Sequence, residues 1–170
     1  VPVVEPFTLA FLRWTMAFLL LLPFAGHGVW QHRVTLRAHW KTVVLLGFLG
    51  MWICGALVYF ALHHTSATNA TLIYTSSPII ILLLEWGFRG RSIAVREMIG
   101  IVLALAGIAL IVAKGSLAVL LSLTFNIGDL VMALCAISWA IYSVLLKRRV
   151  FADVPTLSLF AIVAFAGAVT

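Results

Sequence analysis

Long apolar runs separated by short polar connections organise this sequence. Six runs are rich enough in Leu, Ile, Val, Phe and Ala to form membrane-spanning helices, which need roughly 20 apolar residues, with about 17 to 25 tolerated. We expect these helices at 7–24, 42–62, 69–88, 97–112 and 129–146, with a sixth from Pro155 to Thr170. The fourth run is short unless residues 113–123 extend it.

The same pattern argues against β-structure. A lone strand leaves backbone groups unpaired in lipid, and the chain lacks the alternating segments of about ten residues that build a barrel. Hydrophobic residues make up 64% of the chain and charged residues only 9%, whereas a soluble domain carries about 25% charged residues. We therefore predict an all-α polytopic membrane helical bundle with the lipid bilayer as its solvent.

The basic residues indicate how the chain is oriented. A net charge of +6 could suggest nucleic-acid binding, but the Lys and Arg residues form no single patch. Three of them fall in each of the connections 25–41, 88–96 and 147–154, whereas 63–68 has none and 113–128 has only Lys114. Cytoplasmic loops carry such an excess. We therefore predict that the three basic connections are cytoplasmic, in a bacterial inner membrane, and that no nucleic acid is bound.

A faint internal repeat suggests a symmetric architecture. The segment "EPFTLAF" at 5–11 is echoed by "DVPTLSLF" at 153–160, and each combines an acid, a Pro, Thr-Leu and a Phe. A repeat unit of five helices, the first lying before this sequence, would account for the spacing. Because five is odd, the second copy would be inverted relative to the first, as in many secondary transporters.

Four motifs, in their order and spacing, resemble the EamA family of the drug/metabolite transporter superfamily. The family's repeats open with a Gly-Asp helix that carries a Trp and a Tyr, as in "GDLVMALCAISWAIYSVLLKRR" at 128–149. Its second helix has a Pro and an Arg, as in "EPFTLAFLRW". Its fourth and fifth helices are similar to "ATNATLIYTSSP" and "GIVLALAGIALI". The family often has Gly-Glu-Arg after the fourth helix, where this chain has Gly-Arg-Ser at 90–92.

The resemblance implies an organisation and an activity. It implies ten helices in inverted five-helix repeats, of which this truncated chain holds helices two to seven. Residues 1–127 would be the first repeat without its first helix, and 128–170 the start of the second. The implied activity is secondary active transport, with export of small organic metabolites or drugs by alternating access. A non-transporting membrane protein, either an assembly partner or an inactive truncated remnant, is the alternative, and a homodimer stays open.

Polar residues in the middle of run 69–88 need an explanation. Pro78 lacks an amide donor and frees the carbonyl one turn earlier, at Tyr74. A freed carbonyl is tolerated only inside protein or beside a wet cavity. Ser77 and its neighbours could line a substrate cavity, or their hydroxyls could bond back to their own helix. Asn69 is placed to cap the start of this helix.

Four further residues are candidates for substrate binding. Arg13 could draw a carboxylate at the outer mouth of a cavity, or its stem could simply reach the interface. Trp139 and Tyr142 lie three apart and share a helix face, which suggests either an aromatic cavity wall or core packing. Tyr59 could line the cavity or anchor the helix at the interface.

Small residues favour helix packing rather than chemistry. A stripe at Gly100, Ala104 and Gly107 allows a close helix contact. Three more glycines, Gly47, Gly50 and Gly55, lie along run 42–62 and could also permit bending.

Motifs for catalysis and cofactor binding are absent from this sequence. It contains no phosphate-binding Walker A loop, nucleotide fingerprint, catalytic triad pattern or zinc signature. Cys54 and Cys135 lie deep in apolar runs and are expected to be core residues. We therefore expect no enzyme activity, no metal and no cofactor, and a small organic solute as the ligand.

Overall fold

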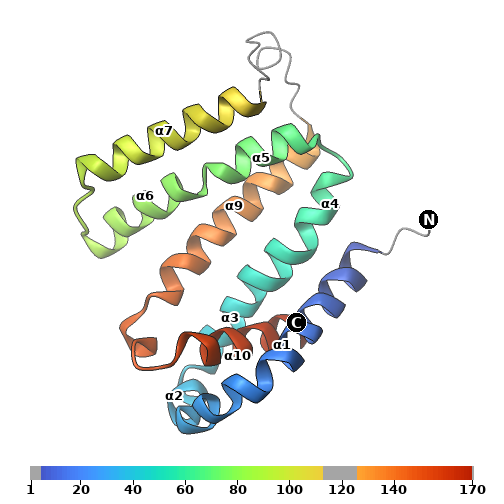
Figure 1. Ribbon diagram of the computed structural model, residues 1–170, viewed down its shortest axis with the longest axis vertical. Coiled ribbons are helices and arrows are strands. Elements are labelled where there is room, and N and C mark those ends of the chain that lie inside the picture. Colours follow the sequence, from blue (N-terminus) through green and yellow to red (C-terminus); the bar gives the residue numbers. More distant parts are fainter. Residues whose placement is uncertain (1–4, 113–125, 170) are drawn as a thin grey trace. The chain divides into compact units, whose positions relative to one another are not determined.

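A computed structural model describes residues 5–112 and 126–169, which form helices joined by short turns (Figure 1). The helices are α1 (Pro6–Gln31), α2 (Arg33–Ala38), α3 (Trp40–Gly47), the π-helix η1 (Phe48–Leu57), α4 (Val58–Leu62), α5 (Ala67–Thr75), α6 (Ser77–Arg89), α7 (Val95–Val112), α9 (Ile127–Leu146), the 3₁₀-helix η2 (Arg149–Phe151) and α10 (Thr156–Val169). The residues that the structure describes contain no strand. The predicted all-α class is confirmed.

Four helical stretches among the described residues are long and apolar enough to cross a bilayer. They are Phe7–Gln31, Trp40–Leu62, Ala67–Arg89 and Ile127–Leu146. The predicted runs 97–112 and 155–170 correspond to α7 and to the shorter helix α10. The proposed extension of the fourth run through 113–123 lies outside the described residues. Together these helices confirm a polytopic membrane bundle.

The connection 25–41 is helical, which corrects its assignment as a loop. Helix α1 continues to Gln31, and α2 follows after the single residue His32. Backbone hydrogen bonds span the two bends, from Leu36 N–H to the His32 carbonyl at 3.0 Å and from Val43 N–H to that of His39 at 3.1 Å. Residues 25–41 contain no proline. A glycine inside a helix costs only about 1 kcal/mol, so the chain stays helical here.

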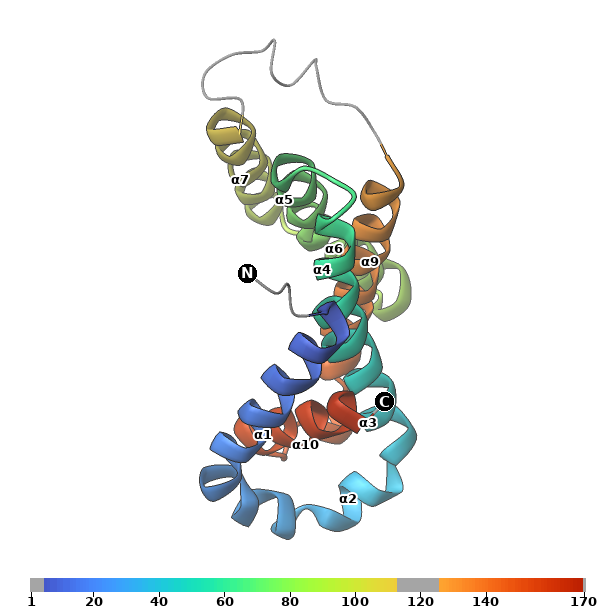
Figure 2. The ribbon, with the colours of Figure 1, turned by 90° about the vertical axis from the view of Figure 1, so that its right-hand side faces the viewer.

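The chain forms two compact units. The first contains residues up to Leu57 and those from Tyr142 onward, and the second contains Val58–Ile141. In the first unit α10 crosses α1 and packs against α3 and η1 (Figure 2). Glycines permit these approaches, because a Cβ added to Gly47 would lie 2.6 Å from the backbone nitrogen of Gly167. The buried hydroxyl of Ser158 also donates to the Ala25 carbonyl at 3.0 Å.

The second unit has its own apolar core. Helix α7 packs against α5, and α6 continues the line of α5 (Figure 1). The core joins residues from α4, α5 and α9: Val58, Ala61, Ala70, Ile73, Tyr74, Val131 and Met132. At one end of this core, a Cβ added to Gly128 would lie 2.7 Å from the His64 carbonyl carbon, so α9 begins in direct contact with the turn before α5.

Candidate functional site

The π-helix η1 is the main irregularity of the first unit. It occupies ten residues, with the sequence FLGMWICGAL, in the middle of the Trp40–Leu62 span. π-Helical turns are rare, and they are frequent at functional sites. The segment contains no proline, so the wider winding has to be supported by its neighbours. Aromatic rings from other helices pack against two of its residues, Gly50 and Gly55.

A side chain of α1 hydrogen-bonds to the backbone of η1. The Trp14 indole N–H donates to the Met51 carbonyl at 2.9 Å. Gly55 makes room for this contact, because an added Cβ would lie only 2.7 Å from the indole nitrogen. Backbone polar groups in the bilayer core have to be bonded within the protein, and this bond gives a carbonyl of the π-helix a partner from a different helix.

Arg13 lies beside this contact. Its guanidinium carbon is 4.5 Å from the centre of the Trp14 ring, which is within the range of a cation–π interaction. One of its terminal nitrogens would be 3.5 Å from a Cβ at Gly55, so the charge sits close to η1. An arginine inside a span is costly unless it faces a partner, protein or water. Here the indole supplies one such partner.

Tyr142 borders η1 as well. Its buried ring packs on Gly50, where an added Cβ would lie 2.7 Å from two ring carbons. Further along η1, Trp52 stacks on Phe48 with ring centres 5.3 Å apart. The structure therefore brings two of the predicted site residues, Arg13 and Tyr142, to the same ten-residue segment.

Ser77 and Pro78 lie at a break in the second unit. The α-helix is interrupted at Ser76, between α5 and α6. The hydroxyl of Ser77, which is buried, donates to the Tyr74 carbonyl at 2.5 Å. Thr75 and Ser76 likewise donate to the carbonyls of Thr71 and Ile73, at 2.6 Å each. In this conformation, the hydroxyls bond back to their own helix.

The remaining two predicted residues also belong to the second unit. Tyr59 on α4 and Trp139 on α9 are both half-buried. Their part in a substrate cavity stays a prediction.

A buried carboxylate was missed by the sequence reasoning. Asp129, at the start of α9, is only 3% exposed. It accepts hydrogen bonds from the Thr65 hydroxyl, from the Asn69 amide at 3.2 Å and from the Asn126 backbone N–H at 2.8 Å. Asn126 in turn accepts from the Asp129 N–H at 3.2 Å.

This reciprocal arrangement is a capping box. The pattern Asn-x-x-Asp at 126–129 before an apolar run could have revealed it. The expected role of Asn69 as a cap is corrected, because the cap of α5 is Ser66, whose side chain accepts from the Asn69 N–H at 3.1 Å. Ser66 precedes the first turn of α5, whereas Asn69 lies within it, and so its side chain is available to Asp129.

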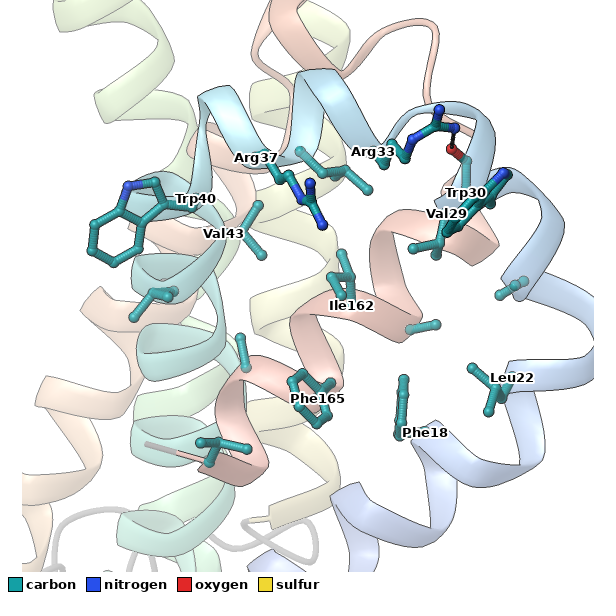
Figure 3. Close-up of a pocket in the computed structure, with 17 residues that line it drawn as sticks. Phe18, Leu22, Val29, Trp30, Arg33, Arg37, Trp40, Val43, Ile162 and Phe165 are labelled. Carbon is teal, nitrogen blue, oxygen red and sulfur yellow. Dashed lines mark hydrogen bonds between the residues drawn. The ribbon is translucent and has the colours of Figure 1, made fainter.

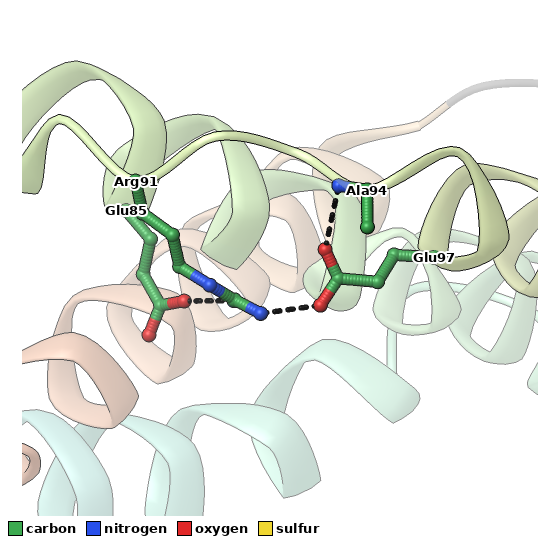
Figure 4. A network of polar contacts seen from close by, with 4 residues as sticks. All are labelled: Glu85, Arg91, Ala94 and Glu97. Atoms are coloured by element: carbon green, nitrogen blue, oxygen red, sulfur yellow. Dashed lines mark hydrogen bonds and ion pairs between the residues drawn. The ribbon is translucent and has the colours of Figure 1, made fainter.

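Arg91 organises the turn between α6 and α7 (Figure 4). It donates to Glu85 at 2.6 Å and to Glu97, which also accepts from the Ala94 N–H at 3.0 Å. Hydrogen bonds to Glu85 and Glu97 raise the pKa of Arg91 above its ordinary value. Arg91 occupies the position at which the family often has an acidic residue. In this chain it pairs with two glutamates. Within 5–112 and 126–169, no group of three or more His, Cys, Asp or Glu could hold a metal ion.

Several helices of the described residues are long and apolar enough to cross a membrane. They define the class of the protein as a polytopic α-helical membrane protein. The chain belongs to the EamA-like transporter family, whose model matches residues 1–113.

Curated relatives carry the word transporter in their names. The chain is 31% identical over 160 residues to an uncharacterized transporter of Archaeoglobus fulgidus, covering 92% of this chain and 53% of that protein. It is 29% identical over 115 residues to the uncharacterized transporter YyaM of Bacillus subtilis, covering 68% of this chain and 38% of that protein. The chain spans about half the length of the first of these relatives and less of the second. No solved structure matches.

Proposed function

We propose that the full-length protein is a secondary transporter that exports small organic solutes across a bacterial inner membrane by alternating access. Membership of the transporter family supports the transport class. The observation that carries the proposal is the contact between α1 and η1, where the charge of Arg13 lies over Trp14 beside a π-helical segment. A cation and an aromatic ring of one span, packed beside irregular backbone of another span, are features of a solute-binding region.

Arg13 selects the chemical class of the solute in this proposal. A guanidinium group binds carboxylates through two parallel hydrogen bonds. Trp14 holds Arg13 in place, and its ring offers an apolar surface for the organic part of a solute. We therefore propose that the preferred solutes carry a carboxylate or another anionic group.

Substrate contacts are also proposed for the other predicted residues. Trp139 and Tyr142 lie one helical turn apart on α9 and supply aromatic surfaces, and Tyr59 supplies a phenol. Ser77 contributes only in a conformation in which its hydroxyl leaves the Tyr74 carbonyl. Pro78 allows that part of the helix to bend, because the ring removes one backbone hydrogen bond.

Transport by the full-length protein tests the proposal. Purified protein in proteoliposomes would be supplied with radiolabelled amino acids and carboxylic acids, and accumulation by counterflow would be measured. Arg13→Ala should lower accumulation of an anionic solute by at least about tenfold, since removing a charge partner costs roughly 2 kcal/mol or more. Trp139→Ala should lower it as well, and Arg13→Lys should retain part of it.

An exposed arginine provides the matched control. Arg148→Ala removes a cation from the connection 147–154 and should leave accumulation unchanged. Full transport by both Arg13→Ala and Trp139→Ala would remove the site assignment. A full-length protein that accumulates none of the solutes would favour the alternative of an assembly partner.

A further inference from the structure

A separate hollow in the first unit lies between α1, α2, α3 and α10 (Figure 3). Its volume is about 550 Å³, and no residue of η1 lines it. Its walls are apolar and come from all four helices, with Phe18, Leu22, Val29, Val43, Ile162 and Phe165 among them. A cavity of this size falls within the range of roughly 300 to 1,000 Å³ that accommodates a small ligand.

Two arginines of α2 border the hollow, and they differ in their contacts. Arg33 stacks on Trp30, with its guanidinium carbon 4.5 Å from the ring centre, and donates to the Trp30 carbonyl at 3.0 Å. Arg37 instead extends into the space between α2 and α10, toward Ile162 (Figure 3). Neither of the ion pairs found among the described residues involves Arg37. It therefore presents a cation to an apolar hollow.

The charge around the hollow is of one sign. Residues 25–41 contain two Arg, one Lys and three His and no Asp or Glu. The carboxylate that would normally neutralise Arg37 is thus absent from its own segment. The complementary ligand has to carry the negative charge itself.

Two tryptophans indicate the depth of the hollow in the membrane. Trp30 and Trp40 border it and are 68% and 58% exposed. Exposed tryptophans gather at the level of the lipid headgroups, and the connection that holds them is predicted to be cytoplasmic. The cytoplasmic leaflet contains the anionic phospholipids that attract Lys and Arg near the surface. The apolar walls match the acyl chains of such a lipid, and the cation at headgroup level matches its phosphate.

We propose that this hollow binds an anionic phospholipid, with an acyl chain against the wall that holds Leu22 and the contacting rings of Phe18 and Phe165, and the phosphate at Arg37. The inference does not depend on the transport function, because its evidence lies in α1, α2, α3 and α10. It predicts that lipid remains bound to the purified protein and that binding depends on headgroup charge.

Native mass spectrometry of the full-length protein tests the headgroup contact. The detergent-solubilised protein would be titrated with phosphatidylglycerol, with phosphatidylcholine of the same acyl chains and with oleate. Arg37→Gln should weaken phosphatidylglycerol binding about fivefold, the effect of one basic residue near the surface. Arg148→Gln removes an exposed arginine elsewhere and should change binding by much less. Equal effects of the two variants, or equal binding of both phospholipids by the native protein, would overturn the proposal.

A glycine substitution tests the acyl-chain part. Gly26 lines the hollow, and a Cβ added there would meet no atom within 4 Å, so Gly26→Leu is expected to place its side chain in the hollow. Gly100→Leu on α7 is the matched control, because a Cβ there also meets nothing within 4 Å. Only Gly26→Leu should reduce phosphatidylglycerol binding, by severalfold. Unchanged binding would show that the lipid does not occupy the hollow and would overturn the proposal. Binding of oleate as tight as that of phosphatidylglycerol would assign the hollow to a free fatty acid and overturn the proposal.

Discussion

Two spans of this protein depart from α-helical geometry near their middles, and they do so in different ways. In the second unit, the helix breaks at Ser76, two residues before Pro78, and the Ser77 hydroxyl bonds to the Tyr74 carbonyl. In the first unit, the winding widens over the ten residues of η1 without a proline, and Trp14 from α1 bonds to the Met51 carbonyl.

The two irregularities differ in the source of their hydrogen-bond partners, which is the same helix in one case and another helix in the other. The break at Ser76 is satisfied by neighbours in sequence, so it needs no other helix to keep its carbonyls bonded. The widened turn of η1 has a carbonyl whose partner comes from a different helix, and its glycines accommodate rings from α1 and α9. A movement of α1 would therefore change the bonding of η1, whereas the Ser77 contact would persist.

The largest effect is expected from closing the glycine contact beside η1. Gly47→Leu would drive a side chain into the backbone of Gly167 and Ala166, at 2.6 and 2.9 Å from the new Cβ. Backbone atoms cannot rotate away, so we expect a loss of about 3 kcal/mol of unfolding free energy. Unfolding by SDS in mixed micelles would measure it.

The control for this variant is Gly100→Leu, which adds the same side chain where nothing lies within 4 Å. It should change the unfolding free energy by no more than about 0.5 kcal/mol. Equal losses in the two variants would mean that leucine itself, rather than the close approach of α10, is responsible.

A smaller effect is expected from removing the tertiary donor. Trp14→Phe keeps an aromatic ring and loses the N–H that bonds to Met51, which should cost about 1 to 2 kcal/mol because the carbonyl is left without this donor. Trp86→Phe, at a 59% exposed position, should cost much less. The same SDS titration would compare them.

Gly55→Ala provides a second way to break that contact. Its added methyl group would lie 2.7 Å from the indole nitrogen and displace the ring. Because both changes act on one hydrogen bond, the double variant should lose less stability than the sum of the single losses. Strict additivity would show that Trp14 and Gly55 contribute independently.

The smallest effect is expected at the helix break beside Ser77, where the hydrogen bond forms within one helix. Ser77→Ala should cost about 1 kcal/mol, since the Tyr74 carbonyl loses its hydroxyl donor. In a Pro78→Ala background the restored N–H can bond to that carbonyl, so Ser77→Ala should cost little there. A double-mutant cycle measured by SDS unfolding would give a coupling of about 1 kcal/mol. A coupling near zero would show that the hydroxyl does not compensate for the proline.

The sequence allowed some of these features to be predicted and not others. The apolar runs predicted the helices, and Pro78 predicted a break close to its observed position because proline acts within one turn. The π-helix was not predicted, because FLGMWICGAL holds only glycines as a local sign and its support comes from Trp14. The helical character of 25–41 was also not predicted, because polar residues end the apolar run there and exposed helices and loops share that pattern.

The candidate site shows the same limit. Arg13 was recognised as costly in a span, yet its stacking on Trp14 and its nearness to Gly55 depend on how α1 packs. The expected packing of the stripe at Gly100 and Gly107 is not found among the described residues, where added Cβ atoms would meet nothing within 4 Å. A stripe of small residues permits a partner helix without specifying one.

The carboxylate of Asp129 has a consequence for motion. It accepts hydrogen bonds from the turn before α5, from α5 itself and from the residue that precedes α9. Separating any one of these segments would remove a hydrogen-bond donor from a buried carboxylate. This corner of the second unit should therefore move as a rigid body, so that any bending of the unit occurs along its helices rather than at their junction.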